Sequence, residues 1–147
     1  MKFGKVETNS VIQTAAPSVD HTGSGIKITL TATENVSFGD VCYINATGEA
    51  QIVDADAIAT SSGLVMAMED INMNNPGTFL LTGVVRDDSW AWATLGGLIY
   101  ITTTGTTTNT LTQAAPSATN DVIQIVGVAT HADRMYFCPS LVQVEHL

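Results

Sequence analysis

Residues 39–48, Gly39-Asp40-Val41-Cys42-Tyr43-Ile44-Asn45-Ala46-Thr47-Gly48, decide the fold. The apolar run VCYI stands between two groups of turn-forming residues, Gly-Asp before it and Asn-Ala-Thr-Gly after it. A short apolar run bounded by such turns is typical of a buried strand. Residues 50–53, AQIV, follow the second turn, and we therefore predict that they form a hairpin with residues 41–44.

A second stretch, residues 96–105 (GGLIYITTTG), repeats this pattern. Both copies read glycine, any residue, two apolar residues, tyrosine, isoleucine, two polar or small residues, threonine and glycine. Each copy precedes a polar hairpin and two further apolar runs. Two copies are too few for a solenoid, so we predict two pseudo-repeated halves, residues 36–86 and 94–145, packed around one core. Chance convergence of two β-hairpins is the alternative.

Further strands are expected wherever apolar runs alternate with Gly, Pro, Asn and Asp clusters. Residues 26–30 alternate apolar and polar side chains, as a half-buried strand does, and apolar residues nowhere recur at helical spacing over three turns. Many short strands of this kind indicate a barrel or a sandwich. The threonine-rich segment 102–112 is expected to be a flexible, solvent-exposed hairpin tip. The remaining expected strands are 64–68, 78–85, 98–102, 122–129, 134–137 and 141–144.

Residues 1–24 have the composition of an extended N-terminal arm rather than of a core. They include the segments TAAPS (14–18) and, at their end, GSG (23–25), which are turn and linker sequences. Their apolar residues Phe3, Val11 and Ile12 are too sparse to form a core alone. We expect the arm either to be disordered or to lie across a neighbouring subunit, and residues 25–147 to form the folded domain.

The composition excludes several classes of function. Only 13% of the residues are charged, against about 25% in an average domain. The 14 acidic residues outnumber the 5 basic ones and give a net charge of -9, which argues against binding nucleic acid or an anionic membrane. The N-terminus lacks the apolar region of a signal peptide, so we expect assembly in a cytoplasm. An exterior of small, neutral polar groups suits contact with other proteins.

Residues 87–92 (DDSWAW) are the most site-like segment. Adjacent residues of an extended chain point to opposite faces, so Asp87 and Asp88 are not expected to share a site, and we expect both in a solvated loop. Trp90 and Trp92 would share a face. They are expected to close a core or anchor an interface, with stacking on a sugar as the alternative.

No constellation of an enzyme or of a metal centre is present in the sequence. No serine lies in a Gly-x-Ser-x-Gly elbow, and the three histidines are far apart in the chain. Two cysteines and three histidines have no metal-ligand spacing, so neither a metal nor another cofactor is expected. Cys42 and Cys138 lie in apolar runs and are expected to be buried free thiols, although a disulfide between them stays open.

Four segments of the C-terminal half resemble a module of tailed-phage virion proteins: residues 96–102, 111–117, 122–129 and 132–140. Residues 38–41 resemble the first half of the same module, so that the likeness covers residues 35–147. It implies a small β-barrel or β-tulip domain, usually a homotrimer, seated on junctions of the major capsid protein. The matching motifs are structural, and none is distinctive of the lambda-type decoration protein.

The sequence and this resemblance together predict a non-catalytic capsid decoration (cement) protein that stabilises the shell from outside. Its expected capsid or trimer contacts are Phe3, Val11, Ile12, Trp90 and Trp92. Three alternatives stay open. They are a head-fibre or tail-spike module that binds host glycans, a hydrolase that uses Asp87 or Asp88, and a β-domain without any link to phages.

Overall fold

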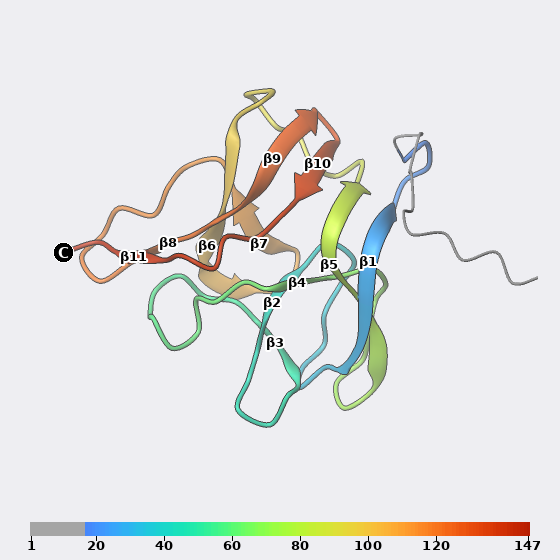
Figure 1. The fold of residues 1–147 in the computed structure, drawn as a ribbon, viewed down its shortest axis with the longest axis horizontal. Coiled ribbons are helices and arrows are strands. Elements are labelled where there is room, and N and C mark those ends of the chain that lie inside the picture. Colours follow the sequence, from blue (N-terminus) through green and yellow to red (C-terminus); the bar gives the residue numbers. More distant parts are fainter. Residues whose placement is uncertain (1–16) are drawn as a thin grey trace, which may run out of the picture.

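Strands make up all of the regular secondary structure of residues 17–147, which are the residues that the computed structural model describes (Figure 1). No helix occurs in this part of the chain, so the predicted all-β fold is confirmed. No helix between residues 17 and 147 could therefore span a membrane. The strands are β1 (Thr22–Thr31), β2 (Val41–Ile44), β3 (Ala50–Ile52), β4 (Val65–Ala67), β5 (Pro76–Arg86), β6 (Leu98–Thr106), β7 (Asn109–Thr112), β8 (Val122–Ile123), β9 (Ile125–His131), β10 (Arg134–Phe137) and β11 (Val144–Glu145).

The main sheet is antiparallel and nearly closes into a barrel. Its strands follow the order β3-β2-β4-β5-β10-β9-β6-β7, and β1 pairs with β5 outside this path. β5 is long enough to pair with β4 through its first half and with β10 through its second half, while β1 follows its whole length. The two ends of the order come together where Val41 N in β2 donates a hydrogen bond to Thr110 Oγ1 in β7, at 3.0 Å. The expected barrel-like architecture is therefore observed.

One large core cluster joins both ends of the sheet. It contains Val41 and Met66 from the first part of the chain and Ile101 and Phe137 from the second, all of them fully buried. A second cluster around Phe79 fills the space between β1, β3 and β4. Burial of a side chain of this size stabilises the fold by about 1.5–3 kcal/mol, so these clusters explain why the apolar runs of the sequence become strands.

The strand order is the same in the two parts of the chain. It reads β3-β2-β4-β5 from one end of the sheet and β7-β6-β9-β10 from the other. Gly39 and Gly96, which the sequence aligns, both have a positive φ, at 84° and 74°. These observations support two pseudo-repeated halves, whose equivalence in three dimensions stays a prediction.

One expectation about the strands is confirmed in part, and another is wrong. The segment 102–112 is the expected hairpin with an exposed tip, since β6 pairs with β7 and residues 103, 104 and 106–109 are exposed, but Thr102 and Thr110 are buried. β-branched threonine fits a half-buried strand well, and the strand pairing extends to Thr106 and Asn109, next to the turn. The strand expected at 141–144 is wrong, because Leu141 and Val142 face solvent and only β11 pairs, with β8.

The chain joins the barrel earlier than residue 25. Thr22, Gly23 and Ser24 belong to β1, so the linker expected at 23–25 is a strand. Just before it, the Ser18 carbonyl accepts a hydrogen bond from Arg86 Nη1 at 3.0 Å. Residues 1–16 of the predicted arm, with the expected contact residues Phe3, Val11 and Ile12, lie outside the described residues, and the role of the arm stays a prediction. The C-terminus lies across the molecule from β1 (Figure 1).

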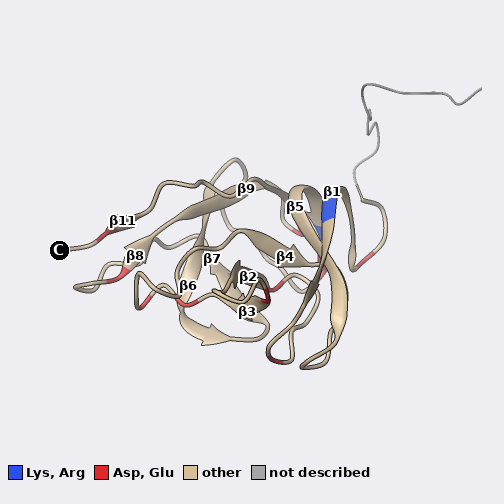
Figure 2. Cartoon of the chain, turned by 60° about the horizontal axis from the view of Figure 1, so that its bottom comes forward, with Lys and Arg blue, Asp and Glu red and all other residues tan. Residues whose placement is uncertain are grey.

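Charges are few and lie mostly in loops. Every acidic residue between 17 and 147 except Glu145 is outside the strands, and Figure 2 shows the acidic positions distributed around the molecule. Lys27 is the basic residue of β1. Apart from Lys27, Arg86 in β5 and Arg134 in β10, the main sheet thus carries neutral side chains, as the composition predicts.

Candidate functional site

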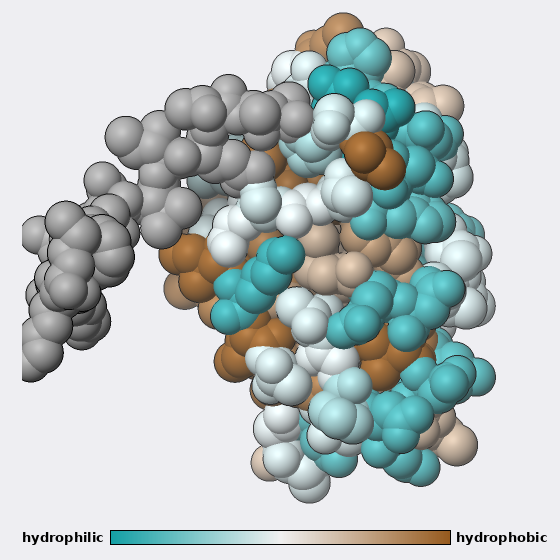
Figure 3. All heavy atoms as spheres, turned by 90° about the vertical axis from the view of Figure 1, so that its right-hand side faces the viewer, coloured by the Kyte–Doolittle hydropathy of each residue, from teal (hydrophilic) through white to brown (hydrophobic). Residues whose placement is uncertain are grey.

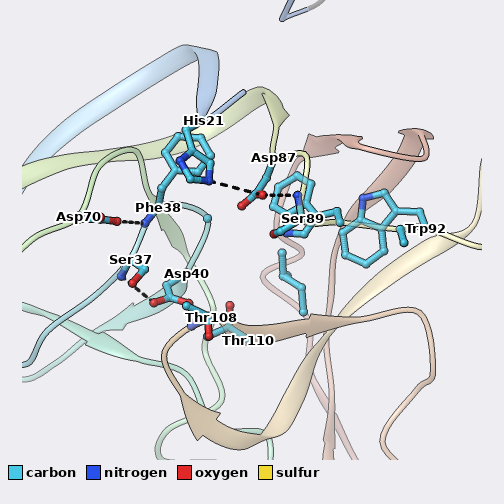
Figure 4. A pocket seen from close by; sticks show the side chains of 14 residues that line it. His21, Ser37, Phe38, Asp40, Asp70, Asp87, Ser89, Trp92, Thr108 and Thr110 are labelled. Carbon is cyan, nitrogen blue, oxygen red and sulfur yellow. Dashed lines mark hydrogen bonds and ion pairs between the residues drawn. The ribbon is translucent and has the colours of Figure 1, made fainter. Parts of the chain in front are cut away.

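A pocket of about 540 Å³ lies where three loops meet at one end of the barrel (Figure 4). Its walls come from the loop before β2, from the loop after β5 and from β7 with the turn that precedes it. His21, at the start of the described chain, closes one side. Pockets of this volume are of the size that holds small ligands or side chains.

Asp87 is, with Asp40, one of two buried carboxylates of this pocket. Its side chain is 7% exposed, and its Oδ1 accepts a hydrogen bond from Ser89 N at 2.8 Å. The backbone holds it from both sides, because Asp87 N donates to Asp133 O at 3.0 Å and Asp87 O accepts from Trp90 N at 3.1 Å. The expectation of a solvated loop is therefore wrong for Asp87, since the turn that it closes folds back over its side chain.

Asp88 points away from the pocket. Its Oδ1 is 2.6 Å from Arg86 Nε, and its side chain is half exposed. Its backbone N–H donates to Asp20 Oδ1 at 2.7 Å, which lowers the pKa of the Asp20 carboxyl. The prediction that Asp87 and Asp88 do not share a site is confirmed.

Trp90 and Trp92 lie together in the wall of the pocket, with ring centroids 5.3 Å apart and ring planes inclined by 43°. Both are partly buried and pack against the main core cluster. Trp92 Nε1 is buried, and no described residue accepts a hydrogen bond from it. The predicted shared face of the two rings is thus observed, whereas their expected contact with a capsid or trimer partner stays a prediction.

Asp40 lines the pocket, and both of its carboxylate oxygens are occupied by hydrogen bonds from neighbouring loops. It is buried, and its Oδ2 accepts hydrogen bonds from Ser37 N at 2.8 Å and Thr107 Oγ1 at 2.5 Å, while its Oδ1 accepts from Thr108 N at 2.7 Å. Burial raises the pKa of Asp40, and these three hydrogen bonds oppose that rise. Asp40 therefore fastens the loop before β2 to the turn between β6 and β7. Sequence analysis did not single it out, although a Gly-Asp pair before a buried strand was a usable signal.

His21 stacks on Phe38 with ring centroids 4.8 Å apart. Its Nε2 lies 3.6 Å from Asp87 Oδ1 and 3.9 Å from Asp20 Oδ1, so these three residues could offer one nitrogen and two oxygens to a metal ion. Both oxygens already accept backbone hydrogen bonds, from Asp88 N and Ser89 N. That arrangement explains the cluster without a metal, and the expectation that no metal or other cofactor is bound stays a prediction.

The remaining candidate residues lie outside the pocket. His131 Nδ1 is 2.6 Å from Asp133 Oδ1 on an exposed turn. Neither cysteine is in a disulfide, and the two differ in burial. Cys42 is buried as predicted, and burial raises the pKa of its thiol, whereas Cys138 is exposed and that prediction is wrong.

A C-terminal apolar segment, residues 141–147, is the most exposed apolar part of the described chain. Leu141 is 85% exposed, Val142 71% and Leu147 97%. Gln143 Nε2 holds the segment on the barrel through a 3.0 Å hydrogen bond to Ser62 Oγ. Contiguous exposed apolar side chains, such as the adjacent Leu141 and Val142, mark sites of contact with other proteins.

No protein-family model, curated protein or solved structure matches this chain. The pocket and the C-terminal apolar segment are therefore interpreted from their own geometry.

Proposed function

We propose that this chain is a structural virion protein that decorates the outside of a tailed-phage capsid and stabilises the shell. In this proposal it is a homotrimer, assembles in the host cytoplasm and binds the major capsid protein. The observation that carries the proposal is the C-terminal apolar segment, whose side chains have no cover within residues 17–147. A partner protein that covers them would remove apolar surface from water, which favours association.

The surface of the barrel supports adhesion to proteins. Figure 3 shows the face that carries β1 and β5, where small apolar patches alternate with polar residues. Few charges have to be desolvated when a partner covers such a surface. The net charge of -9 opposes contact with packaged DNA and so favours the exterior of the shell.

The mechanism that we propose is mechanical. A trimer that bridges several capsid subunits adds contact area that must be lost before the shell can open. A stable interface buries about 1,200–2,000 Å², and many copies on one lattice multiply that restraint.

Co-sedimentation with undecorated capsids tests the proposal. The protein should pellet with the capsids, and the double variant Leu141→Ser/Val142→Ser should pellet at least ten-fold less because it removes the exposed apolar surface. Met73→Ser is the matched control, since Met73 is also exposed but lies outside the C-terminal apolar segment. Failure of the unchanged protein to bind capsids would refute the proposal, and light scattering should report a trimer.

The predicted arm is tested by a truncation. Deletion of residues 1–16 should leave a folded barrel that no longer holds expanded capsids. The cut stops before Ser18 and Asp20, because both bind the end of β5 and the loop after it. Unchanged capsid binding by this truncated protein would show that the arm does not contribute to capsid binding.

A glycan-binding head-fibre or tail-spike module is the second candidate, and the pocket wall made by Trp90 and Trp92 favours it. Aromatic rings of this kind can stack on sugars. Binding on a glycan array that is lost in a folded Trp90→Ala variant would support this alternative over the capsid role.

A further inference from the structure

One oxygen of the buried Asp87 carboxylate has an open hydrogen-bonding position. Oδ1 accepts from Ser89 N, but no described residue donates a hydrogen bond to Oδ2. The side chain is nine-tenths buried, being 7% exposed, and it lines the pocket. Oδ2 is not among the buried polar atoms of the described residues that lack a partner, so it can accept a hydrogen bond from a group that enters the pocket from solvent. A group that brings an N–H donor into the pocket would therefore be stabilised at Oδ2.

The charge of the pocket selects a cation for this position. Three carboxylates line it, those of Asp40, Asp70 and Asp87, whereas its lining includes no lysine or arginine and His21 is its basic residue. The nearby Arg86 is engaged elsewhere, with Asp88 at 2.6 Å and Asp133 at 3.1 Å. A cation in the pocket would gain from this field, whereas a neutral sugar would not.

Trp90 stands beside the same oxygen. A Cβ placed on Gly39 would lie 3.2 Å from Trp90 Cζ2 and 3.4 Å from Asp87 Oδ2, so the indole and the open carboxylate oxygen flank one point of the wall. Figure 4 shows the side chains of Asp87 and Trp92 on the same side of the pocket. An aromatic face next to a carboxylate suits a guanidinium, which stacks on the ring while it donates hydrogen bonds to the oxygen.

We propose that this pocket receives a basic side chain, an arginine, that a partner protein presents. The guanidinium donates to Asp87 Oδ2 and packs on Trp90, and the surrounding carboxylates supply the electrostatic attraction. The identity of the partner as a capsid subunit rests on the proposed function, but the recognition of the guanidinium does not.

Intrinsic fluorescence tests the proposal directly, because the two tryptophans of the chain both line this pocket. The full chain is titrated with N-acetylarginine amide and, in parallel, with N-acetylcitrulline amide, which has nearly the same shape without the charge. A saturable fluorescence change is expected with the arginine derivative. At least ten-fold weaker binding is expected for the citrulline derivative, because a hydrogen bond to a charged group is stronger than a neutral one.

A pair of neighbouring carboxylates supplies matched variants. Asp87→Asn removes the proposed charge but keeps an oxygen for Ser89 N, and it should weaken arginine binding about ten-fold or more. Asp88→Asn removes the same charge outside the pocket and should change binding less than about two-fold, since exposed charges are screened.

Three results would overturn the proposal. The first is equal binding of the arginine and citrulline derivatives, and the second is an equal effect of Asp87→Asn and Asp88→Asn on binding. The third is a saturable fluorescence change with glucose, N-acetylglucosamine or zinc chloride while the arginine derivative produces no such change. Failure of the capsid proposal is distinguishable. In that case the arginine derivative still binds, whereas the protein does not sediment with capsids.

Discussion

Gln124 should be one of the most costly polar residues to replace in this domain. It lies between β8 and β9 and is 1% exposed. Its Oε1 accepts from Gly63 N at 2.8 Å, and its Nε2 donates to Gly63 O at 3.0 Å and to Ser140 O at 2.7 Å. Gln124→Met keeps the length of the side chain but removes all three hydrogen bonds. Each contributes about 1 kcal/mol net, and the abandoned backbone groups stay away from water, so the free energy of unfolding should fall by about 3–5 kcal/mol.

Gln113 is the matched control, because it makes the same pair of hydrogen bonds at the surface. Its Oε1 accepts from Thr94 N at 3.0 Å and its Nε2 donates to Thr94 O at 2.7 Å. Water can replace these bonds, so Gln113→Met should cost less than about 1 kcal/mol. Urea unfolding followed by tryptophan fluorescence measures both variants. Equal losses, or a loss below about 1 kcal/mol for Gln124→Met, would refute the argument that burial sets the cost.

Three further predictions follow from the described residues. A thiol reagent should label Cys138 rapidly in the native protein and Cys42 only after unfolding, because Cys42 is buried and its thiol pKa is raised; fast labelling of both would contradict this. Gly83→Ala should destabilise the fold by about 2 kcal/mol or more, because the added Cβ would collide with the Ser24 carbonyl across the β1–β5 ladder, and thermal unfolding will show this. Carboxyl NMR titration should place the pKa of Asp40 above the ordinary value of about 3.9. The folded state then binds this proton first, so the Asp40 contribution to stability should fall as pH rises from about 4 through its folded pKa; a folded pKa at or below the ordinary value would reverse that sign.

The fold could be predicted because the strongest sequence signal is local. Apolar runs between turn residues located β2 and β10 to the residue, since a buried strand between two turns has little freedom to shift. The burial of two threonines in the segment 102–112 could not be predicted, for a different reason. Threonine is common both in strands and on exposed surfaces, so its presence does not predict burial. The pairing of β6 with β7 is what buries Thr102 and Thr110.

The pocket could be predicted only in part. The shared face of Trp90 and Trp92 follows from their spacing in the chain. The burial of Asp87 does not, because it depends on Asp133 and on the loop before β2, which are distant in sequence. The same holds for Asp40, whose partners lie 67 and 68 residues away. Long-range polar contacts of this kind leave no periodic signal in the sequence.

The path of the chain into the barrel determines where a fusion partner can be attached. Pro17 is four residues from His21, so the peptide bond that precedes it lies within about 18 Å of the pocket mouth, at roughly 3.5 Å per residue. The opposite terminus emerges on the far side of the molecule (Figure 1). A fluorescent protein or affinity tag fused directly to Pro17, in the truncation that lacks residues 1–16, is tethered next to the cavity and raises its own local concentration there. A fusion placed after Leu147 leaves the cavity accessible and instead crowds the apolar tail, so the two fusions would separate the contributions of these two surfaces.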